Sequence, residues 1–149
     1  MTHSTADSAF VTKALEGGNA EVELGTLAEQ RASNDKVKQF GRQMVTDHTK
    51  AEDELKGLAS SKGMNVPSSM DTKSETAKTR LSRLSGAAFD RAYMEDMVSD
   101  HEHDVTAFRK EAEHGTDPDI KAFASKTLPI LEEHLRKAQE TLGEVKKSA

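Results

Sequence analysis

Three histidines in the middle of long helical patterns are the side chains of this sequence best suited to chemistry. His48 and His101 end two copies of one motif, MVTDH at Met44–His48 and MVSDH at Met97–His101, and His134 lies in a third helical pattern. Neutral imidazoles are good ligands for Zn²⁺, Fe²⁺, Mn²⁺ and Cu²⁺. If the three rings meet, the sequence predicts a site for one transition metal ion (zinc, iron, manganese or copper) or for a small ligand.

A carboxylate from the first helical pattern is expected to complete this site. The long helices are expected to start at residues 8, 34, 87 and 118. Each of them has a polar side chain 14 to 16 residues after its start. All four therefore reach the same depth if the second and third long helices are parallel. The predicted metal ligands are Glu23, His48, His101 and His134.

Three further polar residues are expected around the ligands. Asp47 and Asp100 each precede a histidine by one residue and so point about 100° away around the helix. Carboxylates so placed accept a hydrogen bond from a metal-bound imidazole, and we expect both to do this across to a neighbouring helix. Asn19 is assigned to the same outer layer. His3, His103 and His114 are assigned to solvent.

A metal-free interpretation accounts for the same residues. Buried polar groups need hydrogen-bond partners, and a layer of His, Asp, Glu and Asn19 could form a closed network that sets the helix register. Dinuclear iron bundles place Glu three residues before His, whereas Val45, Val98 and Leu131 occupy those positions here. Any metal centre is therefore expected to be mononuclear, and no serine or cysteine nucleophile motif or phosphate-binding loop is present.

Four long helices are expected to position these side chains. Apolar residues recur at spacings of three and four along each of them, which is the pattern of a helix packed in a bundle. The predicted helices span about 8–32, 34–62, 87–113 and 118–146, with a short helix at 73–84 and a polar tail at 1–7. Asp7 or Ser8 is the expected cap of the first helix, and Thr72 with Glu75 matches a capping box.

The segment from Met64 to Gly86 is too long for a simple turn between neighbouring helices. A helix of 28 residues is about 42 Å long, and this segment with its short helix can cover that distance. Such a crossover makes the second and third long helices parallel. The prediction is therefore an all-α protein, a ferritin-like four-helix bundle in one domain, residues 8–146, with a long crossover.

Composition and charge exclude several classes of protein. The net charge of −5 and the absence of a clustered basic face argue against nucleic-acid binding. No apolar run is long enough to span a membrane, and Met1–Ser8 has no signal-peptide core. The expected location is the periplasm if a leader has been removed, and otherwise the cytoplasm. No protein partner can be named from the sequence, and a homodimer is left open.

A family resemblance is carried by six segments: Glu16–Glu23, Val37–His48, Phe89–His101, Ile120–Phe123, Thr127–Pro129 and His134–Leu135. Together they resemble the bacterial family called domain of unknown function 4142. The resemblance extends from Phe10 to about Leu142 and implies a ferritin-like bundle, a bacterial source and, for many members, export to the envelope. It implies no reaction.

Three functions follow as hypotheses. The first is a non-enzymatic bundle of the envelope or stress response that binds one transition metal or small ligand at its centre. The second is a metal-dependent oxidoreductase, against which the missing Glu-x-x-His pattern counts. The third is a metal-free structural or partner-binding bundle.

Overall fold

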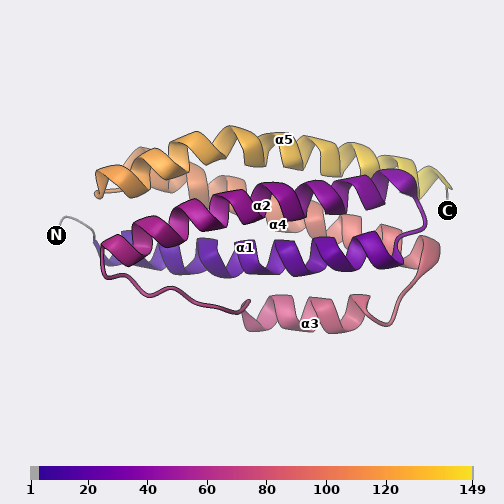
Figure 1. The fold of residues 1–149 in the computed structure, drawn as a ribbon. Helices are drawn as coiled ribbons and strands as arrows, with labels where there is room; N and C mark the ends of the chain where they lie inside the picture. The colour runs from indigo at the N-terminus through magenta and orange to yellow at the C-terminus, as the bar shows by residue number, and fades with distance from the viewer. Residues whose placement is uncertain (1–3, 149) are drawn as a thin grey trace.

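The computed structural model describes residues 4–148, and it is helical almost throughout (Figure 1). No strand occurs in this part of the chain, so the predicted all-α class is confirmed. Its helices are α1 (Thr5–Arg31), α2 (Asp35–Ser61), α3 (Thr72–Leu81), α4 (Gly86–His114) and α5 (Pro118–Ser148).

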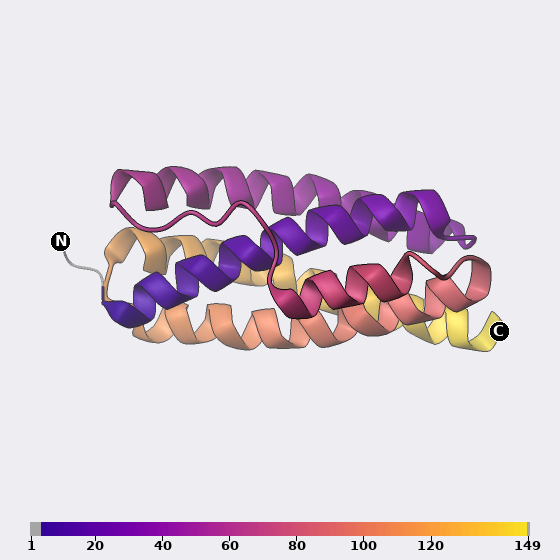
Figure 2. The same ribbon diagram turned by 90° about the horizontal axis from the view of Figure 1, so that it is seen from below.

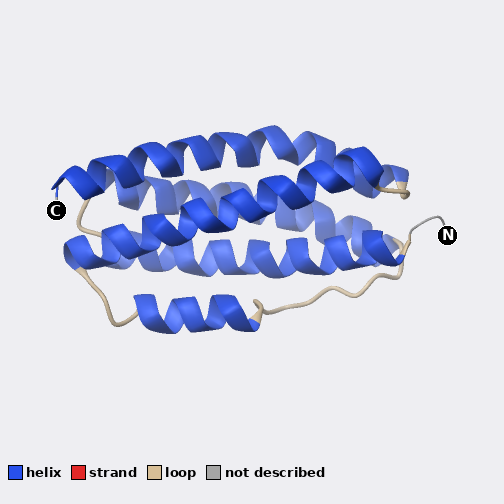
Figure 3. Ribbon diagram, turned by 180° about the vertical axis from the view of Figure 1, so that it is seen from behind, coloured by secondary structure: helices blue, strands red, loops and turns tan. Residues whose placement is uncertain are grey.

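The four long helices form a bundle, and the chain between α2 and α4 runs the length of that bundle (Figure 1). As predicted, α2 and α4 are parallel, while α1 and α5 run the opposite way. Contacts are most numerous between α1 and α2 and between α4 and α5, and contacts of α1 with α4 and of α2 with α5 close the bundle. Figure 3 shows that α3 is the one helical part of the crossover.

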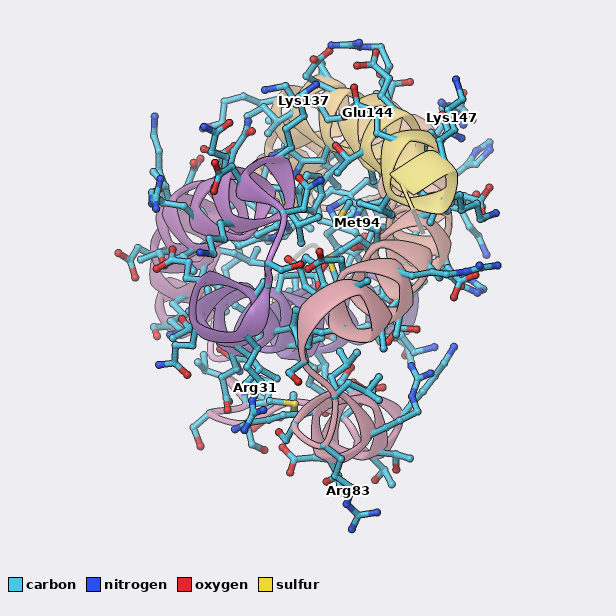
Figure 4. The ribbon with its side chains drawn as sticks, turned by 90° about the vertical axis from the view of Figure 1, so that its right-hand side faces the viewer. Arg31, Arg83, Met94, Lys137, Glu144 and Lys147 are labelled. Carbon is cyan, nitrogen blue, oxygen red and sulfur yellow. The ribbon has the colours of Figure 1, made fainter. Side chains whose placement is uncertain are left out.

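The short helix α3 lies outside the four-helix core, against α1 and α4 (Figure 2). Seen along the bundle, Met94 points in among the long helices and α3 lies beyond them (Figure 4). Lys78 on α3 pairs with Glu23 on α1, and Arg80 pairs with Asp96 on α4. No helix within residues 4–148 combines the length and apolar character needed to cross a membrane.

Two predicted helix caps are wrong. Helix α1 begins at Thr5 because Ser4 and Asp7 form a capping box, in which the Ser4 hydroxyl accepts from the Asp7 amide and the Asp7 carboxylate accepts from the Ser4 amide. The expected tail is therefore shorter, and residues 1–3, including His3, lie outside the described residues. Helix α3 is preceded by Asp71 without a side-chain cap, so the expected Thr72 box does not form.

The core consists of two apolar clusters, one toward each end of the bundle. One contains Leu24, Met44, Met97 and Ala138, and the other contains Leu15, Leu55, Val105 and Leu131. Each long helix changes from one cluster to the other near its middle. Buried polar side chains lie between the two clusters, among them Glu21, His48, His101 and His134. The fold therefore divides its core with a central polar layer.

Helices α1 and α2 pack closely where two glycines face each other. A Cβ on Gly25 would lie 2.6 Å from the Gly41 carbonyl oxygen, and a Cβ on Gly41 would lie 2.8 Å from the Gly25 carbonyl oxygen. Neither position has room for a side chain. This contact fixes the register of α1 on α2, about one helical turn from Glu21 in α1 and about two turns from His48 in α2.

Candidate metal centre

The three predicted histidines come together at the centre of the bundle. His48 comes from α2, His101 from α4 and His134 from α5, and their ring centroids are 5.4 to 5.8 Å apart. One ligand nitrogen from each ring lies within 4.8 Å of the other two. The rings therefore converge from three helices, as the sequence predicted for parallel α2 and α4.

A backbone hydrogen bond fixes the ring of His101. Its Nδ1 lies 2.8 Å from the carbonyl oxygen of Met97, one helical turn earlier. A carbonyl can only accept, so Nδ1 carries the hydrogen and Nε2 carries the lone pair. Nε2 is buried and has no hydrogen-bond partner among the described residues.

A carboxylate fixes the ring of His134 in the same way. Its Nε2 lies 2.7 Å from Oδ2 of Asp47, which belongs to α2. Nε2–H donates to the carboxylate, so Nδ1 carries the lone pair. Nδ1 is buried and unpaired, as is Nε2 of His48. Each histidine of the cluster thus has one buried ring nitrogen with no partner in the described structure.

All three imidazoles are held neutral. Burial lowers the pKa of His48 well below its usual range, and the neighbouring His101 and His134 lower it further. Burial and His134 lower the pKa of His101 to about 4. Burial also lowers the pKa of His134, although Asp47 partly opposes this. Neutral imidazole is the form that binds a metal ion.

The predicted fourth ligand, Glu23, is not in the cluster. Its side chain is half exposed and forms an ion pair with Lys78 of α3 at 2.6 Å. The carboxyl that α1 brings to the polar layer is that of Glu21, two residues earlier and about 200° away around the helix. Glu21 is only 2% exposed, and its Oε2 lies 3.6 Å from Nδ1 of His101. It therefore lies behind the His101 ring.

Asp100 does not repeat the contact of Asp47. Asp47 hydrogen-bonds to His134 of α5, whereas Asp100 lines a cleft together with Glu21 of α1. Burial, followed by the charges of Asp100, Asp104 and Asp96, raises the pKa of Glu21 well above its usual range. Burial and Asp96 raise the pKa of Asp100 to about 6. Asp100 therefore belongs to an acidic cleft between α1, α3 and α4.

Asn19 also has a different role from the one predicted. Its side-chain amide donates to the carbonyl oxygens of Pro67 and Ser69, at 3.3 and 3.0 Å. It thus ties the crossover to α1 and has no hydrogen bond to a histidine among the described residues. His103 and His114 are exposed, as expected.

Two buried carboxyl groups near the histidines, those of Glu21 and Glu52, were not predicted from the sequence. Both have oxygens without a hydrogen-bond partner in the described part of the chain. A signal for each was present, since Glu21 lies three residues before Leu24 and Glu52 lies four after His48 and three before Leu55. These spacings place both on the core face of their helices.

Comparison with known proteins identifies the sequence family and the fold. A family model described as "Domain of unknown function (DUF4142)" matches residues 1–141. No curated protein matches the sequence.

Three crystal structures resemble the bundle at low sequence identity. A DUF305 fragment from Deinococcus radiodurans has a TM-score of 0.85 at 14% identity, covering 97% of this chain and 99% of that one. A Streptomyces coelicolor protein described as "putative secreted protein DUF305" has a TM-score of 0.81 at 16% identity, covering 94% and 92%. A conserved hypothetical protein from Mycobacterium tuberculosis has a TM-score of 0.69 at 20% identity, covering 93% and 92%. These likenesses concern the fold.

Proposed function

The chain belongs to the DUF4142 family, and we propose that it is a non-enzymatic metal-binding bundle that holds one transition metal ion at His48, His101 and His134. The observation that carries this proposal is the buried, unpaired nitrogen on each of the three rings. The rings are neutral and converge from three helices, and Asp47 orients one of them as a carboxylate orients a metal-bound histidine.

The same nitrogens argue against a purely hydrogen-bonded layer. Nε2 of His101 and Nδ1 of His134 both carry lone pairs, because the other nitrogen of each ring donates a hydrogen bond. Two acceptors cannot hydrogen-bond to each other, and leaving them buried and unpaired costs about 1 to 3 kcal/mol each. One water molecule has two hydrogens for these two nitrogens, and it could serve all three rings only if Nε2 of His48 carries a hydrogen and donates to the water oxygen. A metal cation accepts lone pairs from all three.

The spacing of the rings sets a requirement on binding. Nitrogens bound to a tetrahedral zinc ion at about 2.0–2.1 Å are roughly 3.3 Å apart. The ligand nitrogens here lie within 4.8 Å of one another, so any pair farther apart than about 3.3 Å has at most about 1.5 Å to close when a metal binds. The donor set of three imidazoles, without cysteine, suits zinc, iron, manganese or copper. Met44 and Met97 lie one turn before His48 and His101 in the core and could add soft donors for copper(I).

The test is a zinc titration of metal-free protein, followed by calorimetry and by melting curves. We expect one zinc ion per chain and a higher melting temperature, since a ligand that binds only the folded state stabilises it. His101→Asn should lose both effects. His103→Asn, an exposed change two residues along the same helix, should keep them. Absence of zinc, iron, manganese and copper binding to the unaltered protein, or equal binding by both variants, would refute the proposal.

For the compartment, we propose the bacterial envelope if the chain derives from an exported precursor, and the cytoplasm otherwise. Export is supported by the likeness to the Streptomyces coelicolor protein, whose description is "putative secreted protein DUF305". Fractionation of the native cells, with an antibody against the bundle, would locate the protein. Its presence only in the cytoplasmic fraction would refute the envelope location.

A further inference from the structure

A small cavity lies one helical turn beyond the histidines. Glu52 follows His48 by four residues and Asp104 follows His101 by three, and α2 and α4 are parallel, so both displacements run the same way along the bundle. Gly17 and Gly18 precede Glu21 by four and three residues on the antiparallel α1. The cavity has a volume of about 30 Å³, and its lining includes Gly17, Gly18, His48, Glu52 and Asp104.

Two unpaired ligand atoms belong to residues that line this cavity. Nε2 of His48 and Oε2 of Glu52 are both buried and have no hydrogen-bond partner among the described residues. Glu52 is 9% exposed, and burial raises the pKa of its carboxyl. An isolated carboxyl in such a place is costly for folding unless something binds there.

A glycine makes room for the Glu52 side chain. A Cβ on Gly18 would lie 2.7 Å from Cγ of Glu52 and 3.2 Å from its Cδ. The side chain therefore lies against the bare backbone of α1. Its carboxyl is held inside the bundle by packing, since no hydrogen bond from the described residues holds Oε2.

The remaining wall is mainly apolar and the space is the size of one small ligand. Leu55, Phe108, Phe123 and Leu131 contribute to the lining. A cavity needs about 10–15 Å³ to hold a water molecule, together with at least two polar partners. This cavity satisfies both conditions if a metal ion at the histidines supplies one partner and Glu52 supplies the other.

We propose that the metal centre is open toward this cavity, where an exchangeable water-sized ligand of the metal hydrogen-bonds to Glu52. This inference rests on the proposed function and extends it by defining the fourth coordination position. Structural zinc sites are closed by four protein ligands, whereas reactive ones keep a position for water or another small molecule. The ligand class is a small neutral or anionic molecule such as water, hydroxide or azide.

Cobalt(II) absorption with azide as the probe tests this at pH 8. The unaltered protein should bind one Co²⁺, and azide should shift the visible spectrum. An ionised Glu52 accepts from metal-bound water but repels an anion, so Glu52→Gln should bind azide about tenfold more tightly, equivalent to about 1.4 kcal/mol. Glu54→Gln, on the exposed face of the same helix, should behave as the unaltered protein.

A second pair of variants tests the cavity itself. A Cβ would meet nothing within 4 Å at Gly17, which lines the cavity, or at Gly57, which is exposed. Gly17→Leu should keep Co²⁺ binding and lose the azide response, while Gly57→Leu should keep both. Cobalt binding without any azide response, or Glu52→Gln with unchanged azide affinity, would overturn the open centre alone. Failure of cobalt to bind at the histidines would overturn the proposed function, and the open centre with it.

Discussion

The carboxylate of Asp47 on α2 accepts a hydrogen bond from Nε2 of His134 on α5, with the two atoms 2.7 Å apart. The bond joins two helices across the central layer and directs the other nitrogen of the ring, Nδ1, away from the carboxylate. Asp100, the equivalent residue of the repeated motif, instead lines a cleft together with Glu21 of α1. The two copies of the motif therefore differ in what they contribute to the site.

This difference predicts that matched substitutions of Asp47 and Asp100 change the zinc affinity by different amounts. Asp47→Asn should weaken zinc binding about 10- to 100-fold, since the amide no longer orients and polarises the His134 ring. Asp100→Asn should change the affinity less than twofold, because Asp100 has no hydrogen bond to a described histidine. Isothermal titration of both variants measures the effect. Equal losses in the two variants would mean that charge alone, and not the Asp47 contact, governs binding.

The buried carboxyl of Glu21 should destabilise the metal-free protein. Its oxygens are buried and unpaired in the described structure, so Glu21→Met should raise the free energy of unfolding by about 1 to 3 kcal/mol. The raised pKa keeps this carboxyl protonated in the fold while the unfolded chain ionises, so the gain should be larger at pH 8 than at pH 5.

Denaturant unfolding at the two pH values gives the answer, with Glu23→Met as the control. Glu23 forms an exposed ion pair, which contributes about 0 to 1 kcal/mol. If Glu23→Met stabilises the protein as much as Glu21→Met, the buried carboxyl is not the cause.

Asn19→Ala should loosen the crossover. The change removes donors to the Pro67 and Ser69 carbonyls and should lower the free energy of unfolding by about 1 to 3 kcal/mol. Limited proteolysis should cut the variant faster within residues 65–71, while zinc affinity stays the same. A loss of zinc affinity together with unchanged proteolysis would mean that Asn19 supports the metal ligands and not the crossover.

A second buried carboxyl gives a pH dependence far from the histidines. Burial and the neighbouring Asp7 raise the pKa of Glu111 to about 8. In the unfolded chain this pKa is near its ordinary value of 4.5. The folded state therefore retains a proton that the unfolded state releases, and the stability it provides is complete below pH 4.5 and is lost as the pH rises toward 8.

Glu111→Gln should remove this loss. Between pH 5 and pH 9 the unaltered protein should lose at least about 1.4 kcal/mol more than the variant, the value of one pKa unit. Glu113→Gln, an exposed change on the same helix, should follow the unaltered protein. Parallel stability profiles for all three proteins would contradict the assignment.

The sequence was sufficient for the bundle and for the three histidines. Seam spacings of three and four placed His48 and His101 in the core, and the long crossover implied that their helices are parallel. The choice of Glu23 failed because it relied on depth along the helix alone. Glu21 is at nearly the same depth and continues the seam of Leu24 and Ala28, so the direction around the helix decides between them.

The contacts of the residues around the histidines depend on which helices lie side by side, and a single sequence does not specify this. Asp47 and Asp100 have nearly the same local sequence, yet one hydrogen-bonds to a histidine of α5 and the other lines a cleft with Glu21 of α1. Asn19 hydrogen-bonds to the crossover. The path of that segment over α1 cannot be predicted from the spacing of apolar residues. The spacing of Glu52 places it on the core face of α2. That its Oε2 has no hydrogen-bond partner among the described residues, and that its side chain packs against Gly18, is shown only by the structure.

The most direct measurement is a crystal structure of the protein soaked in zinc, with anomalous scattering recorded at the zinc edge. The expected result is one strong peak among Nε2 of His48, Nε2 of His101 and Nδ1 of His134, about 2.0–2.1 Å from each nitrogen. Zinc peaks confined to surface carboxylates, with the three rings unmoved, would contradict the metal centre.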